Sequence, residues 1–176
     1  MKHFFSSDYH LGHKNILLYD KRPFKTVEEM DKAIIDNHNS LVKDEDEFYY
    51  MGDFCMGDRS KLEYYFRNLN GKKFFIKGNH DNRDTIEMYK KYGTYLGSLA
   101  EVRINGKNIV LCHYAMKVWN KSHHGTWHLY GHSHGTLPDD PNSLSIDVGI
   151  NCHNYKPLSF DDIKAIHNSE IQLILL

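Results

Sequence analysis

Apolar runs and amphipathic segments alternate along the first half of the chain. Short apolar and aromatic runs predict three buried strands, at residues 2–7, 48–51 and 73–77. Apolar positions at helical spacing predict three helices, over 27–42, from Asp58 to Leu69, and over 83–92. Thr26 followed by Glu29 forms a capping-box pattern before the first of these helices. Helices interleaved with strands in this way favour parallel strands that share one core.

The second half of the chain is richer in strand signals. Alternating and β-branched segments predict five more strands, at 99–104, 107–112, 127–131, 144–148 and 171–176. The Asn105-Gly106 pair predicts the turn of a hairpin, and Ser159 is expected to cap one more helix over 159–167. These elements together predict an α/β protein in which sheets pack against each other and helices lie outside them.

Composition limits the class of protein. A chain of 176 residues with 40% hydrophobic content predicts one domain that spans residues 1–176. The formal net charge of -1 gives no global basic footprint of the kind that long nucleic acids select. Three scattered cysteines predict reduced thiols and a cytoplasmic location. No apolar run approaches the ~20 residues of a membrane helix, so a soluble protein without membrane partners is expected.

Metal-capable side chains follow the predicted strands in five clusters. The clusters are Asp8 with His10, Asp53 after Gly52, Asn79 with His80 and Asp81, His113, and His132 with His134. Loops at the ends of parallel strands meet at one edge of a sheet, so residues far apart in sequence can converge there. Any one of these histidines or aspartates is more often structural than a ligand. Their joint arrangement nevertheless predicts a two-metal site.

Several other residues are expected to have structural roles. Four histidines are predicted on the surface: His3, His38, His153 and His167. His13 could face the predicted cleft, but a surface position is favoured. Aromatic residues between Tyr114 and Trp127 could stack a nucleobase, but packing over a sheet is favoured.

The ordered motif blocks resemble the signature of the calcineurin-like metallophosphoesterase superfamily, in particular its small bacterial and phage members. The blocks are Asp8-Tyr9-His10, Gly52-Asp53, Gly78-Asn79-His80-Asp81, His113 and Gly131-His132-Ser133-His134. The resemblance implies a four-layer α-β-β-α sandwich of two mixed β-sheets flanked by helices. It implies one metal held by Asp8, His10, Asp53 and His134, and a second held by Asp53, Asn79, His113 and His132. It also implies that His80 is the catalytic histidine and that Asp81 orients it.

The resemblance implies hydrolysis of a phosphoester by a hydroxide that bridges two divalent transition-metal ions. Oxygen and imidazole ligands without thiolate favour manganese, with iron, zinc or nickel as alternatives. The expected substrate is a small phosphodiester or phosphomonoester, with nucleotides and cyclic nucleotides among the candidates, and His80 is expected to assist the leaving group. Two alternatives stay open: a nuclease, which the near-neutral charge disfavours, and a non-catalytic scaffold, which the complete ligand set disfavours.

Overall fold

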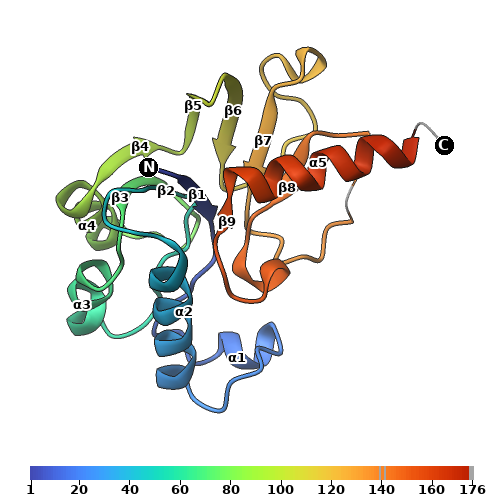
Figure 1. Cartoon of the computed structure of the whole chain (residues 1–176). Coiled ribbons are helices and arrows are strands. Elements are labelled where there is room, and N and C mark those ends of the chain that lie inside the picture. The colour runs from blue at the N-terminus through green and yellow to red at the C-terminus, as the bar shows by residue number, and fades with distance from the viewer. Residues whose placement is uncertain (139, 141, 175–176) are drawn as a thin grey trace.

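Two mixed β-sheets pack against each other and helices flank them (Figure 1). The computed structural model describes residues 1–138, 140 and 142–174. The predicted α/β class, with two mixed sheets and flanking helices, is confirmed. Among the described residues, the helices lack the length and apolar character that crossing a bilayer requires.

The first sheet has the strand order β4-β3-β2-β1-β9. Its strands are β1 (His3–Ser6), β2 (Glu47–Tyr50), β3 (Lys72–Ile76), β4 (Thr94–Gly97) and β9 (Leu158–Ser159). β1 to β4 run parallel, whereas β9 pairs antiparallel with β1. The carboxyl ends of β1, β2 and β3 therefore lie at the same edge of the sheet.

The second sheet has the strand order β5-β6-β7-β8. Its strands are β5 (Leu99–Ile104), β6 (Lys107–Cys112), β7 (Trp127–Tyr130) and β8 (Ser145–Asp147). β5 and β6 form the predicted hairpin, and β6 to β8 run parallel. A parallel bridge between Ser7 and Gly149 joins the end of β1 to the end of β8, so the carboxyl edges of the two sheets meet.

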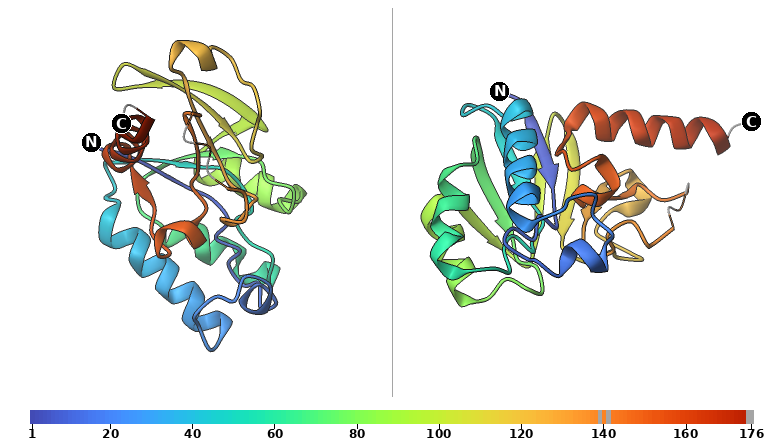
Figure 2. Two further views of the ribbon diagram at one scale, coloured as in Figure 1. Left: turned by 90° about the vertical axis from the view of Figure 1, so that its right-hand side faces the viewer. Right: turned by 90° about the horizontal axis from the view of Figure 1, so that it is seen from below.

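Helices lie beside both sheets (Figure 2). They are α1 (Ile16–Tyr19), α2 (Val27–Leu41), α3 (Leu62–Arg67), α4 (Arg83–Tyr92) and α5 (Phe160–Ile174), with short 3-10 turns η1 (Arg59–Lys61), η2 (Ser122–His124) and η3 (Ile150–His153). α2, α3 and α4 cover one face of the first sheet. α5 packs beside the second sheet, where the ring of Phe160 lies 5.1 Å from that of Trp127.

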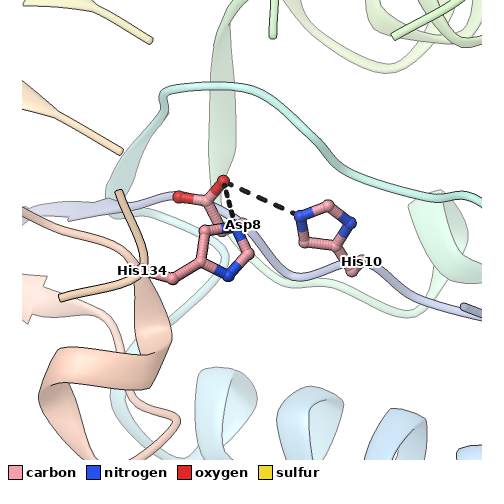
Figure 3. A group of neighbouring side chains, drawn as sticks. All are labelled: Asp8, His10 and His134. Atoms are coloured by element: carbon pink, nitrogen blue, oxygen red, sulfur yellow. Dashed lines mark ion pairs between the residues drawn. The ribbon is translucent and has the colours of Figure 1, made fainter. Parts of the chain in front are cut away.

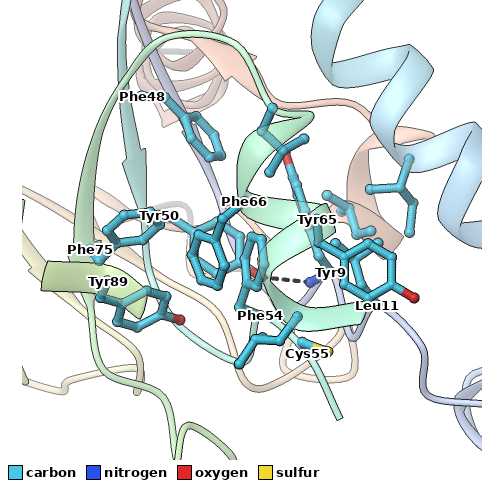
Figure 4. Packing of buried hydrophobic residues seen from close by; sticks show 14 of the residues in the cluster. Tyr9, Leu11, Phe48, Tyr50, Phe54, Cys55, Tyr65, Phe66, Phe75 and Tyr89 are labelled. Carbon is cyan, nitrogen blue, oxygen red and sulfur yellow. Dashed lines mark hydrogen bonds between the residues drawn. The ribbon is translucent and has the colours of Figure 1, made fainter. Parts of the chain in front are cut away.

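Alternation along the strands divides the interior into two cores. Phe4 of β1 and Tyr50 of β2 face the helices, whereas Phe5 and Tyr49 face the second sheet. The helix-side core is largely aromatic, with Phe54 stacked on Phe66 at 4.1 Å (Figure 4). Tight aromatic packing next to the strand ends restricts the movement of the loops that follow these strands.

Most predicted elements are present, and one is wrong. Thr26 caps α2 as predicted, because its side chain accepts a hydrogen bond from the Glu29 amide at 3.2 Å. The strand predicted at 171–176 is wrong, since α5 continues to Ile174; residues 175 and 176 lie outside the described part of the chain. Residues 168–170 contain no glycine or proline to end the helix, and an apolar run alone does not separate helix from strand. The short elements α1, β4 and β9 were not predicted from the sequence.

Two histidines predicted on the surface are buried. His38 of α2 accepts from or donates to the Tyr9 hydroxyl at 3.0 Å and contacts the Asn70 carbonyl oxygen at 3.0 Å. His167 of α5 packs against Trp127 with ring centroids 4.9 Å apart. His38 can face the core because its ring nitrogens meet polar atoms of other segments, and His167 packs its ring on an aromatic side chain; the sequence reveals neither contact.

The burial of His38 predicts a loss of stability in acid. Burial lowers the pKa of His38 from 6.5 to about 4. Neutral His38 thus contributes stability above pH 6.5 that is lost as the pH falls toward 4, by up to about 3 kcal/mol. The free energy of unfolding can be measured by urea unfolding of metal-free protein. The difference in this free energy between wild type and His38→Gln should shrink by up to about 3 kcal/mol as the pH falls from 6.5 to 4. The exposed control His123→Gln should keep a constant difference, and a constant difference for His38→Gln would contradict the prediction.

Candidate metal centre

The seven residues predicted as metal ligands converge where the two sheets meet. Asp8 and His10 follow β1, Asp53 follows β2, Asn79 follows β3, His113 follows β6, and His132 and His134 follow β7. Parallel strands deliver their carboxyl-end loops to a common edge, which is why clusters separated by more than a hundred residues meet here. Within this edge the ligand atoms form two groups.

The first group contains Asp8, His10 and His134 (Figure 3). The Asp8 Oδ1 atom lies 3.8 Å from His10 Nε2 and 3.5 Å from His134 Nε2. Asp8 and His10 are buried, and His134 is partly buried. These three residues each offer one donor atom within 4.8 Å of the others, an arrangement that could hold a metal ion.

The second group contains Asp53, His113 and His132, with Asn79 beside them. His113 Nδ1 lies 2.7 Å from the Met51 carbonyl oxygen, which only accepts, so the ring proton is assigned to Nδ1. The Nε2 atom then faces Asn79 Oδ1 at 2.8 Å and Asp53 Oδ2 at 3.3 Å. Burial opposes a charge on this ring, but the contact with Asp53 and the charges of Asp8 and Asp53 raise the pKa of His113. Such a convergence of lone pairs is favourable only around a proton or a cation.

Asp53 lies between the two groups. Its Oδ2 atom is 3.3 Å from His113 Nε2 in the second group and 3.8 Å from His10 Nε2 in the first. Its Oδ1 atom accepts a hydrogen bond from the His80 amide at 2.8 Å, which fixes the carboxylate plane. This position supports the predicted bridging role of Asp53.

The backbone at the ligand positions is strained. Five of the seven residues have positive φ angles: Asp8, His10, Asp53, His132 and His134. Residues with side chains rarely adopt this conformation, which costs of order 1–3 kcal/mol each and is concentrated at functional sites. Backbone hydrogen bonds hold it in place, from Asp8 N to the Gly52 oxygen and from His10 N to the Asp53 oxygen, both at 3.1 Å.

The charges in the first group are balanced within the protein. Burial alone would raise the pKa of Asp8, but contacts with His134 and the charges of His113 and His10 hold it below its usual value. Burial opposes the charge on His134, but hydrogen bonds to Asp20 and Asp8 raise its pKa to about 10. A cation that takes His134 Nε2 as a ligand must displace this proton, so affinity should fall as the pH is lowered.

Both groups fit a divalent cation by the chemistry of their donors. Both ring nitrogens of His10 are buried and have no hydrogen-bond partner among the described residues. Each unsatisfied buried polar atom costs about 1–3 kcal/mol, a cost that coordination would remove. The donors are carboxylate, amide and imidazole groups without thiolate, which suits manganese, iron or zinc.

Two orienting contacts were not predicted from the sequence. Asp20 Oδ2 lies 2.5 Å from His134 Nδ1, so the other ring nitrogen of His134 points at Asp8. Asp20 also accepts from Asn151 Nδ2 at 2.9 Å. The Met51 carbonyl oxygen orients His113 in the way that Asp20 orients His134, by a contact with the Nδ1 atom of the ring. Such partners fix the tautomer of a ligand histidine, but no spacing rule identifies them in a sequence.

His80 and Asp81 lie on opposite sides of their loop. The His80 side chain is 43% exposed, and its Nε2 atom is 4.0 Å from Asp53 Oδ2. Asp81 is buried and accepts from the Gly78, Asp53 and Phe54 amides and the Tyr89 hydroxyl, at 2.7–3.1 Å. The expectation that Asp81 orients His80 is therefore wrong. Asp81 instead ties the loop after β3 to the loop after β2, because its oxygens are used by their backbone amides.

Other residues around the centre are mainly structural. Arg22 is buried and donates to the Asp8 and Tyr9 carbonyl oxygens at 2.8 and 2.9 Å, so it stabilises the loop after β1. Trp119 donates to the Thr126 oxygen and packs on His128, as the packing hypothesis predicted. Tyr114 is an exposed aromatic residue next to the ligands, and the centroid of its ring is 4.7 Å from that of His132.

The close approach of Gly78 to Asp53 predicts that an added methyl group will disturb metal binding. A Cβ atom at Gly78 would overlap Asp53 Oδ1. Gly78→Ala should therefore displace the carboxylate and lower affinity for Mn²⁺ at least about 10-fold in calorimetric titration. Gly106→Ala is the control away from the centre: its Cβ atom would meet nothing within 4 Å, and the strain at its φ of +80 is confined to the hairpin turn. Equal affinity in both variants would contradict the assignment of Asp53.

The contact between Asp20 and His134 predicts a second effect on affinity. Asp20→Asn removes the charge that holds His134 Nδ1, so Mn²⁺ affinity should fall about 10- to 100-fold while the fold persists. Asp36→Asn is a matched change at an exposed ion pair with Lys32 and should leave affinity unchanged. Titration of both variants with Mn²⁺ and circular dichroism of the metal-free proteins would check this; undiminished affinity in Asp20→Asn would exclude the orienting role.

Comparison with known proteins gives relatives along nearly the whole chain. No protein-family model matches it. The chain is 34% identical over 173 residues to the uncharacterized protein MJ1445 of Methanocaldococcus jannaschii, covering 94% of this chain and 91% of that protein. It is 25% identical over 199 residues to the Gene 66 protein of Mycobacterium phage L5, covering 94% and 96% of the two chains.

A solved structure shares the fold. The protein of unknown function AQ665 from Aquifex aeolicus matches with a TM-score of 0.71 and 22% identity, over 94% of this chain and 98% of that one. An archaeal phosphodiesterase matches with a TM-score of 0.48 and 17% identity, over 85% and 84%. The two mixed sheets and the two His/Asp groups agree with the predicted resemblance to calcineurin-like metallophosphoesterases. By its identity to MJ1445 across nearly its full length, the chain belongs to the same family as that protein.

Proposed function

We propose that this protein is a metal-dependent phosphoesterase that hydrolyses a small phosphodiester or phosphomonoester. The observation that carries the proposal is the position of the Asp53 carboxylate between two His/Asp groups, with the exposed ring of His80 beside it. Asp8, His10, Asp53 and His134 would hold one divalent ion, and Asp53, Asn79, His113 and His132 the other. Such a pair of ions supplies an activated water nucleophile and neutralises the oxygens of a phosphoryl group.

The remaining chemistry belongs to the side chains. His80 is not part of either ligand group, and its amide is fixed to Asp53 Oδ1. An exposed imidazole held in this way can donate a proton to the oxygen of the departing alcohol. Asp20 and the Met51 carbonyl keep the ligand rings in one tautomer, and Asp81 keeps the two central loops together. Each of these contacts lowers the reorganisation that turnover would require.

We propose manganese as the metal, with iron, zinc or nickel as alternatives, because the donors are oxygen and imidazole nitrogen. A small substrate is favoured over a polynucleotide, since the formal net charge is only -1. Nucleotides and cyclic nucleotides belong to this class of substrate. Metal-stripped protein reloaded with each metal and given an aryl phosphomonoester, an aryl phosphodiester and cyclic nucleotides would separate these classes.

Two substitutions test the division of roles. His80→Asn should leave metal content unchanged and lower kcat about 10²- to 10⁴-fold, because it removes the proton donor and no ligand. Asp53→Asn should lower the content of both metals, because its carboxylate faces both groups. Metal analysis and turnover of the same samples are the measurements. Unchanged turnover in His80→Asn, or two retained metals in inactive Asp53→Asn, would refute the respective role.

A further inference from the structure

His13 lies against the candidate metal centre and not on the open surface that the sequence favoured. Its ring is half-buried, and its centroid is 5.5 Å from that of the ligand His10. Neither His/Asp group includes His13 among the described residues. The ring therefore borders the centre without belonging to its ligand set.

A fixed turn places the His13 ring there. Gly12 has φ +72, and its amide donates to Asp31 Oδ1 at 2.9 Å. The His13 amide donates to the His10 oxygen at 3.1 Å, which folds the chain back over the ligand. A Cβ atom at Gly12 would lie 3.0 Å from Gly57 Cα, so the turn is also packed tightly. These contacts hold His13 beside the centre before any ligand binds.

The His13 ring has an unused polar atom. Its Nδ1 atom is shielded from solvent and has no hydrogen-bond partner among the described residues. The other neighbour of the ring is Tyr19 of α1, whose side chain is largely exposed, with centroids 6.2 Å apart. A buried imidazole nitrogen without a partner is costly, and such atoms in native proteins call for an explanation in function or bound ligand.

His13 and His80 flank the same ligand. The His80 ring is 5.7 Å from that of His10, compared with 5.5 Å for His13. Two imidazoles that do not belong to the ligand groups thus border the first group, and either tautomer of each has an N–H donor. An anion bound over this group would meet donors from both rings.

We propose that His13 is a second substrate-binding histidine, which donates a hydrogen bond to a phosphoryl oxygen. This inference rests on the proposed phosphoesterase function and assigns His13 a role apart from that of His80. The phosphoryl group is the chemical class that fits, because a multiply charged oxyanion can accept from the metals and from an imidazole at the same time. The expected contribution is to binding of the phosphoryl group in the ground state and in the transition state alike.

Inorganic phosphate is the probe, because it has the phosphoryl oxygens and no leaving group. In Mn²⁺-loaded protein, His13→Ala should weaken phosphate binding about 10- to 100-fold by calorimetry and raise KM by a similar factor, with a smaller change in kcat. His13→Gln should recover part of this loss, since its amide can donate near the position of Nε2, whereas Nδ1 is shielded from solvent. Metal content should stay at the wild-type level in both variants.

His124→Ala and His124→Gln are the matched controls, since His124 is an exposed imidazole of η2. They should bind phosphate as wild type does. Wild-type phosphate affinity in fully metal-loaded His13→Ala would overturn the inference, and so would loss of metal from that variant. A wild-type protein that binds phosphate through His13 but cleaves no phosphoester would refute the proposed function and leave the His13 contact standing.

Discussion

The structure around the centre depends on two aspartate carboxylates buried where the sheets meet. Asp8 and Asp53 are almost fully buried, and a buried carboxylate is stable only with close donors or cations. Backbone amides are part of these donors: the His132 amide donates to Asp8, and the His80 amide donates to Asp53. Neighbouring imidazoles supply the rest and lower the pKa of both acids despite burial. The loops that carry the ligands are thus ordered by the charges that they surround.

The loops that carry the ligands contain strained backbone, and the two hydrophobic cores provide the stability that offsets this strain. The positive φ angles at ligand positions are unfavourable, and the cores below them contribute the stability that tolerates them. Polar contacts beyond the ligands then set the geometry. Asp20 orients His134, and Asp81 joins the loops after β2 and β3. Both acids act through other residues, which separates them from His80 and His13, the imidazoles that border the first group without belonging to it.

Local patterns in the sequence predicted much of the fold and of the ligand set. α2 and α4 were predicted because their caps and apolar spacing lie within one segment. The C-terminal strand was wrong because an apolar run fits either helix or strand until its packing is known. His38 and His167 were misplaced for a related reason: their burial depends on partners from other elements.

The sequence alone determined which polar residues follow which strands, because each motif is read within a few positions and parallel strands bring their ends together. Only the tertiary structure decided how these residues are oriented. Asp20 and His134 are separated by 114 positions, and Asp81 turns inward although its neighbour His80 turns outward. Hydrogen bonds between distant loops set these orientations, and residue order along the chain carries no direct record of such contacts.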